Sequence, residues 1–246
     1  MKVLGIDIGG SAFKGAPVDV KTGKLLAERH RVEIDSPCPT AQGLAAARAI
    51  ARHFKWRGPV GLGFPGIILD GRTGAVGNLG HNWEDKDLVA LFGRATGGKV
   101  RALNDADAAG LAEMRFGAGK GCQGSVLMLT FGTGIGSALF YQGRLMPNIE
   151  FGHIPWKGKP IERFASAAVK KRCDLTWKEW AQRVNVFLQV VERLSSPELI
   201  IIGGGVSKKS EKWFKYLKAN ARLVPARMHN DAGIVGAALG WEHAGR

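Results

Sequence analysis

One pattern occurs twice in the sequence, and this repeat restricts the folds open to the chain. Residues 3–20 contain an apolar strand, a turn at Gly9-Gly10-Ser11 and a second apolar strand. Residues 125–141 repeat this arrangement around Gly132-Thr133-Gly134. Glycine turns let successive backbone N–H groups approach an anion, so each hairpin is a candidate phosphate site. Each turn alone could also be structural, and the first matches neither the Walker pattern nor the dinucleotide pattern.

The rest of the chain predicts an α/β fold with a mixed sheet, because apolar runs that favour strands alternate with stretches of helical spacing. The expected strands lie at 60–64, 100–103 and 199–202, and the expected helices at 41–54, 87–95, 177–194, 231–241 and, Lys-rich, from Val206. Gly203-Gly204-Gly205 precedes this Lys-rich helix, and a glycine turn at a helix start is a further candidate anion site. In such folds the ligand crevice lies at the carboxyl ends of the strands.

The pair Asn104-Asp105 stands where a short apolar run meets an Ala-rich helical pattern. Both residues are suited to cap a helix. A carboxylate there lies beside unpaired N–H groups and the positive end of the helix dipole, so it stays ionised and can accept a proton. Asp105 is therefore a candidate general base, and an ordinary helix cap is the alternative.

The net charge of +14 predicts an anionic partner, and it is unevenly distributed. Residues 1–108 carry 15 Lys and Arg against 11 Asp and Glu, whereas residues 109–246 carry 20 against 10. We therefore expect a polyanion to contact the second half. Two basic clusters there could line a groove, or could form a solvated face: Lys157, Lys159, Arg163, Lys170, Lys171 and Arg172 in the first, and Lys208, Lys209, Lys212, Lys215 and Lys218 in the second.

The composition, 45% hydrophobic and 23% charged, is typical of a globular protein. No apolar run is long enough to span a bilayer, and a strand starting at residue 3 leaves no room for a signal peptide, so we expect a cytoplasmic protein without a membrane partner. The cysteines, Cys38, Cys122 and Cys173, are too widely separated to predict a disulfide framework or a thiolate zinc site.

Taken together, the glycine turns and the Asn-Asp pair resemble those of the ROK (repressor, open reading frame, kinase) sugar kinases, and most closely the polyphosphate-dependent glucokinases among them. The resemblance covers nearly the whole chain. It implies the duplicated actin-like ATPase (ribonuclease H-like) fold, with two α/β domains and a cleft. The domains would be residues 1–108, with the last helix at 231–246 packing back on them, and residues 109–230. A homodimer is also implied.

The same resemblance assigns roles to individual residues. Asp105 would take the proton from the 6-hydroxyl of glucose. The residues that would bind the sugar are Asn78, Asn104, Glu150, His153, Glu162 and Gly66. The residues that would bind phosphate are Gly9, Gly10, Ser11, Lys14, Thr133, Gly134, Gly204 and Gly205. Taken singly, the acids and the histidine could also be surface or packed side chains.

Mg²⁺ is expected to offset the charge of the donor. Asp7 would organise the surroundings of this ion, and no residue is assigned as a direct metal ligand. Many family members have a cysteine-rich zinc loop after the Glu-x-Gly-His motif, but residues 154–160 contain no cysteine and are basic. This difference is typical of the polyphosphate-dependent subgroup.

Three other functions compete with this one. A strictly ATP-dependent glucokinase, or another hexose kinase, stays open because Gly203-Gly204-Gly205 suits a nucleotide. A non-catalytic polyanion-binding protein would explain the charge but not a base beside two phosphate turns. A repressor would need a helix-turn-helix before the first strand, where only two residues stand, so we expect no nucleic-acid partner.

Overall fold

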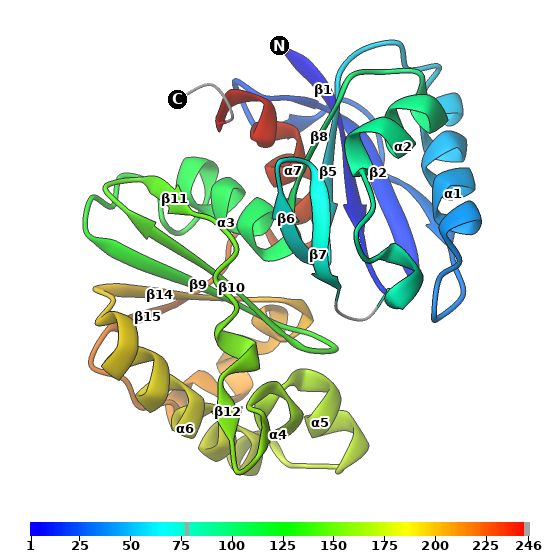
Figure 1. The fold of residues 1–246 in the computed structure, drawn as a ribbon. Coiled ribbons are helices and arrows are strands. Elements are labelled where there is room, and N and C mark those ends of the chain that lie inside the picture. The colour runs from blue at the N-terminus through cyan, green and yellow to red at the C-terminus, as the bar shows by residue number, and fades with distance from the viewer. Residues whose placement is uncertain (77–78, 244–246) are drawn as a thin grey trace. The chain divides into compact units, whose positions relative to one another are not determined.

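The computed structural model describes residues 1–76 and 79–243 of the chain. The chain divides into two compact units, which Figure 1 shows: unit 1 comprises Met1–Ala112 and Asp231–Arg246, and unit 2 comprises Glu113–Asn230. The division falls inside helix α3 (Asp105–Phe116), between Ala112 and Glu113, whereas the sequence placed it between residues 108 and 109.

Unit 1 is built on a mixed sheet in the order β3-β2-β1-β5-β8, with β4 also paired to β2. Its strands are β1 (Lys2–Ile8), β2 (Ala12–Asp19), β3 (Lys24–Leu25), β4 (His30–Glu33), β5 (Val60–Phe64) and β8 (Val100–Asn104). β1 pairs antiparallel with β2, whereas β1, β5 and β8 are parallel. A separate hairpin of β6 (Gly66–Leu69) and β7 (Arg72–Val76) and the 3₁₀ turn η1 (His81–Trp83) complete this part.

Helices cover both faces of this sheet. Alternate residues of β1, Leu4, Ile6 and Ile8, belong to one buried cluster with side chains of α1 (Thr40–His53) and α2 (Leu88–Thr96). The residues between them face α7 (Ala232–His243). A Cβ on Gly5 would collide with the backbone of Ile234, and one on Gly61 with the backbone of Ala237. The glycines therefore let α7, drawn in red in Figure 1, lie directly on the sheet.

Unit 2 repeats the sheet plan of unit 1. Its order is β11-β10-β9-β14-β15, where β9 pairs antiparallel with β10 and parallel with β14, which pairs parallel with β15. The strands are β9 (Ser125–Phe131), β10 (Ile135–Tyr141), β11 (Arg144–Met146), β14 (Leu199–Gly203) and β15 (Arg222–Pro225). The repeated glycine hairpins of the sequence are the β1–β2 and β9–β10 pairs, and the predicted α/β fold with mixed sheets is confirmed.

The remaining elements of unit 2 pack around this sheet. They are η2 (Phe151–His153), the hairpin of β12 (Pro155–Trp156) and β13 (Lys159–Pro160), α4 (Glu162–Ala165), α5 (Ala167–Arg172), α6 (Trp177–Ser195), and the 3₁₀ segments η3 (Gly205–Lys212), η4 (Phe214–Tyr216) and η5 (His229–Asp231). Helix α6 begins with a capping box, in which Thr176 and Glu179 bond each other's backbone N–H groups. Its Trp180 and Phe187 are buried against Phe131.

One prediction about unit 2 is wrong, and several of its strands were not predicted. The Lys-rich segment after Gly205 is a 3₁₀ helix broken at Lys209, not an α-helix, because the Ser207 hydroxyl and N–H both donate to the Gly204 carbonyl. Strands β11, β12, β13 and β15 were not predicted. In the described part of the chain, none of the helices combines the length and apolar character that a bilayer span requires.

Candidate functional site

The first glycine turn joins β1 to β2 in unit 1. It is closed by the Gly9 N–H, which donates to the Ala12 carbonyl at 3.1 Å. Asp7 and Lys14 face each other across the strand pair, and the Lys14 Nζ lies 3.7 Å from Asp7 Oδ2. Burial raises the pKa of the Asp7 carboxyl, and Lys14 partly opposes this effect. The turn residue Ser11 is exposed and Gly10 is half-buried, so the tip of this turn is accessible from solvent.

Asn104 and Asp105 stand at the junction of β8 and α3. The Asn104 Oδ1 accepts from the N–H groups of Ala106, at 2.8 Å, and Asp107, at 3.1 Å, so it caps α3. Its Nδ2 donates to the Gly66 carbonyl at 3.2 Å. Asn104 is only 5% exposed, whereas Asp105, the first residue of α3, is half-buried. The capping bonds therefore fix the backbone that carries the Asp105 carboxylate at the positive end of the helix.

The second glycine turn joins β9 to β10 in unit 2. The Gly132 N–H donates to the Gly134 carbonyl at 3.0 Å, and Thr133 is exposed at the tip. Glu162, the first residue of α4, accepts from the Ile135 N–H at 3.0 Å. A Cβ on Gly134 would collide with this carboxylate. Glu162 thus lies directly against the turn and holds its returning strand.

Glu150 and His153 lie at the ends of one short turn in unit 2. The His153 Nδ1 is 3.9 Å from Glu150 Oε2, and the His153 side chain is 52% exposed. Burial raises the pKa of Glu150, His153 opposes the rise and Glu162 adds to it. A Cβ on Gly152 would collide with the Ile135 carbonyl, which places this turn against the start of β10. Unit 2 therefore brings Glu150, His153 and Glu162 together beside the second glycine turn.

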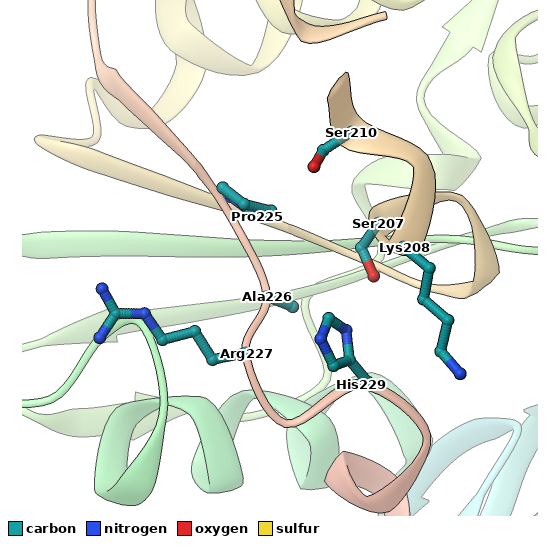
Figure 2. A pocket seen from close by; sticks show the side chains of 7 residues that line it. All are labelled: Ser207, Lys208, Ser210, Pro225, Ala226, Arg227 and His229. Atoms are coloured by element: carbon teal, nitrogen blue, oxygen red, sulfur yellow. The ribbon is translucent and has the colours of Figure 1, made fainter. Parts of the chain in front are cut away.

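The third glycine turn follows β14. Gly204 has a φ of 79°, and a Cβ on it would collide with the backbone of Phe131, the last residue of β9. The second and third turns are therefore adjacent. Beyond the third turn is a pocket of about 390 Å³. Figure 2 shows its lining residues, Ser207, Lys208, Ser210, Pro225, Ala226, Arg227 and His229.

A second basic pocket, of about 470 Å³, lies at another place in unit 2. It is lined by Lys159, Pro160, Arg163 and Arg172, from β13, α4 and α5. The first basic cluster of the sequence thus contributes three cations to this pocket, and the second contributes Lys208 to the pocket beyond the third turn.

The predicted residues form one set in each unit. Unit 1 carries Gly9, Gly10, Ser11, Lys14, Gly66, Asn104 and Asp105, and unit 2 carries Thr133, Gly134, Glu150, His153, Glu162, Gly204 and Gly205. Asn78 lies outside the described residues. Sequence reasoning missed Arg227 and His229, which β15 brings to the third turn. The apolar pair Leu223-Val224 before Pro225 was the available signal for that strand.

Comparisons with known proteins agree on one family. The model of the ROK family matches residues 3–174. The polyphosphate glucokinase of Mycobacterium tuberculosis (strain CDC 1551 / Oshkosh) is 45% identical over 240 residues, covering 96% of this chain and 89% of that protein. The crystal structure of inorganic polyphosphate/ATP-glucomannokinase from Arthrobacter sp. strain KM has a TM-score of 0.94 and 42% identity, covering 99% of this chain and 98% of that one. The ROK hexokinase from Thermus thermophilus has a TM-score of 0.71 and 27% identity, covering 98% and 97%.

Proposed function

Because the chain belongs to the ROK family, we propose that it is a sugar kinase that transfers the terminal phosphoryl group of inorganic polyphosphate to the 6-hydroxyl of glucose. The observation that carries this proposal is the 45% identity, over 96% of the chain, to a polyphosphate glucokinase. The glycine turns and the carboxylates beside them supply the groups that this chemistry needs.

In this proposal Asp105 is the general base. The sugar hydroxyl loses its proton to Asp105 as its oxygen attacks the terminal phosphorus, and the bond to the rest of the donor breaks. The helix start favours the ionised carboxylate, and the Asn104 cap fixes the backbone of that carboxylate. Most of the acceleration in phosphoryl transfer comes from such positioning and from charge stabilisation.

Sugar binding is proposed for Asn78, Asn104, Glu150, His153, Glu162 and Gly66. Carboxylates accept hydrogen bonds from hydroxyl groups, which suits Glu150 and Glu162. The Oδ1 of Asn104 already accepts two backbone bonds, so a sugar contact of Asn104 would use its amide nitrogen. The Glu162 oxygen bonded to Ile135 links the sugar site to the phosphate turn.

Phosphate binding is proposed for the three glycine turns, through Gly9, Gly10, Ser11, Thr133, Gly134, Gly204 and Gly205, with Lys14 as a nearby cation. Among the described residues, no three His, Cys, Asp or Glu side chains gather as a metal cage. Mg²⁺ commonly needs only one or two carboxylates, with waters and substrate phosphates as its other ligands. The half-buried Asp7 beside the first turn fits that requirement by orienting such waters. When bound, Mg²⁺ offsets the charge of the donor phosphates.

Two broader features belong to the same proposal. The sheet plan that the two units share supports the duplicated actin-like ATPase fold. A homodimer is proposed from the resemblance alone, and sedimentation at several protein concentrations would test it.

ATP is a second candidate donor. The Arthrobacter enzyme is described as using both polyphosphate and ATP. The adjacent second and third turns in this chain would suit the phosphates of either donor.

A coupled assay tests the proposed function. Purified protein, glucose and Mg²⁺ are mixed with long-chain polyphosphate or ATP, and glucose 6-phosphate dehydrogenase reports the product. We expect glucose 6-phosphate with polyphosphate. If neither donor gives product, the proposal is wrong.

A further inference from the structure

Three loops of unit 2 follow one another along the same edge of its sheet. β9, β14 and β15 are parallel neighbours, so their carboxyl ends share this edge. The second glycine turn follows β9, the third follows β14, and the segment Ala226–His229 follows β15. The pocket of Figure 2 lies between the last two loops. The pocket therefore follows the second and third glycine turns, the proposed phosphate sites of unit 2, along the same edge of the sheet.

The chemistry of this pocket suits an anion. Its lining includes the cationic side chains Lys208 and Arg227, the imidazole of His229 and two serine hydroxyls, and it contains no carboxylate. Within residues 1–76 and 79–243, no carboxylate lies at ion-pair distance from Lys208, Arg227 or His229. Only Pro225 and Ala226 are apolar, which is a poor surface for the faces of a purine base.

Hydrogen bonds fix both walls of the pocket. On one side, the Ala226 N–H donates to the Ile202 carbonyl at 2.9 Å, and the Met228 N–H donates to Glu113 Oε1 at 2.7 Å. Glu113 is fully buried, and its other oxygen accepts from the Ala118 N–H. On the other side, the Ser207 hydroxyl donates to the Gly204 carbonyl at 2.8 Å. Such preorganisation lowers the cost of binding.

The cations are spread out and do not converge on one point. In Figure 2 the Lys208 and Arg227 side chains extend to opposite sides of the pocket. Single phosphate groups are best held by donors that converge, whereas an extended polyanion offers charge along its length and can use separated cations.

We propose that this pocket binds the phosphate units of polyphosphate that lie behind the reacting unit, and so makes donor use depend on chain length. The inference rests on the proposed function, because it assumes that the donor's terminal unit lies at the glycine turns. The pocket of Lys159, Arg163 and Arg172 has similar charge, but its lining comes from β13, α4 and α5, not from the loops that follow β14 and β15. It supplies the matched control.

The test compares the double variant Lys208→Ala/Arg227→Ala with the control Lys159→Ala/Arg163→Ala. The KM values for tripolyphosphate, long-chain polyphosphate and glucose are measured for each, after thermal melting has verified the fold. We expect the pocket variant to raise the KM for long-chain polyphosphate about tenfold, the effect of roughly 1.4 kcal/mol of lost charge-assisted contacts. The KM values for tripolyphosphate and glucose should stay near wild type, as should all three values in the control.

Added salt provides a second readout. Screening of exposed contacts should raise the wild-type KM for long-chain polyphosphate more steeply than that of the pocket variant. An equal loss with short and long donors, a loss only in the control, or no loss in either variant would overturn the proposal.

Failure of the proposed function would be recognised separately, as a wild-type protein that makes no glucose 6-phosphate. Calorimetric titration of long-chain polyphosphate into wild type and both variants then decides the inference without turnover. Weaker binding by the pocket variant alone supports it. Equal affinities, or no binding by wild type, overturn it.

Discussion

Several of the candidate polar side chains, considered in each unit by itself, support the backbone in addition to any ligand contact. Asn104 caps α3 and bonds the start of β6, and Glu162 holds the strand that returns from the second glycine turn. Replacing either residue would disturb the backbone that it supports as well as the sugar contact proposed for it. Asp105 and Glu150 therefore give clearer tests of the chemistry at the scale of single residues.

Asp105→Asn should lower kcat by about 10²–10⁴-fold while glucose affinity stays near wild type. Asparagine keeps the shape and the hydrogen bonding but cannot accept the proton. Loss of the favourable interaction with the helix dipole should cost less than about 1 kcal/mol of stability. Steady-state kinetics with calorimetric glucose binding checks this, and a variant with nearly normal kcat would show that Asp105 is not the base.

The affinity for glucose should decrease as the pH is lowered, because Glu150 becomes protonated. Burial raises the pKa of this carboxyl, so it becomes protonated at a higher pH than an ordinary glutamate and loses its capacity as a pure acceptor. The KM for glucose should therefore rise as pH drops through this raised pKa, and Glu150→Gln should remove that dependence. A KM profile that is the same in the variant and in wild type would contradict the role of Glu150.

The contribution of Glu150 to the stability of the fold has the opposite pH dependence: glucose affinity should increase with pH, whereas this contribution should decrease. Because the pKa of Glu150 is higher in the folded protein than in the unfolded chain, its contribution to stability is greatest below the ordinary carboxyl range. It is lost as pH rises through the folded value.

At the scale of elements, the helices and hairpins that could be predicted from the sequence are those that local residue patterns determine. The glycine hairpins and the helices α1 and α6 follow from strand runs and helical spacing, and their residues pack as those patterns require. η3 was wrongly predicted because its Ser207 bonds locally to Gly204, a competition that periodicity does not reveal. Arg227 and His229 reach the pocket through the pairing of β15 with β14, a long-range contact that spacing alone does not specify.

Gly61→Ala should destabilise unit 1 because the new Cβ would collide with the backbone of α7 at Ala237. We expect a loss of about 1–3 kcal/mol, or more if α7 cannot shift. Gly93→Ala is the control, since its Cβ would make only an ordinary contact of 3.5 Å with the Gly98 carbonyl. Alanine is also favoured over glycine inside a helix such as α2 by about 1 kcal/mol. Thermal unfolding of both variants checks this, and an unchanged melting temperature for Gly61→Ala would refute the close packing of α7.

For the whole molecule, the loop that carries cysteines in many family members has a consequence for metal content. The loop at 154–160 is closed by backbone pairing of β12 with β13, including Trp156 opposite Lys159, and contains no cysteine. We expect the purified protein to contain no stoichiometric zinc and to regain activity after chelation once excess Mg²⁺ is supplied. Elemental analysis that finds one zinc per chain would contradict this expectation.

The identity of the phosphoryl donor is the central claim, and a competition experiment tests it most directly. Wild-type protein is given glucose, Mg²⁺, ATP labelled in its terminal phosphoryl group and an excess of unlabelled long-chain polyphosphate, and the label in glucose 6-phosphate is measured. If polyphosphate is the preferred donor, most of the product will be unlabelled, and removing polyphosphate will raise the labelled fraction. Product that carries the full label whether or not polyphosphate is present would contradict the account and identify a strictly ATP-dependent kinase.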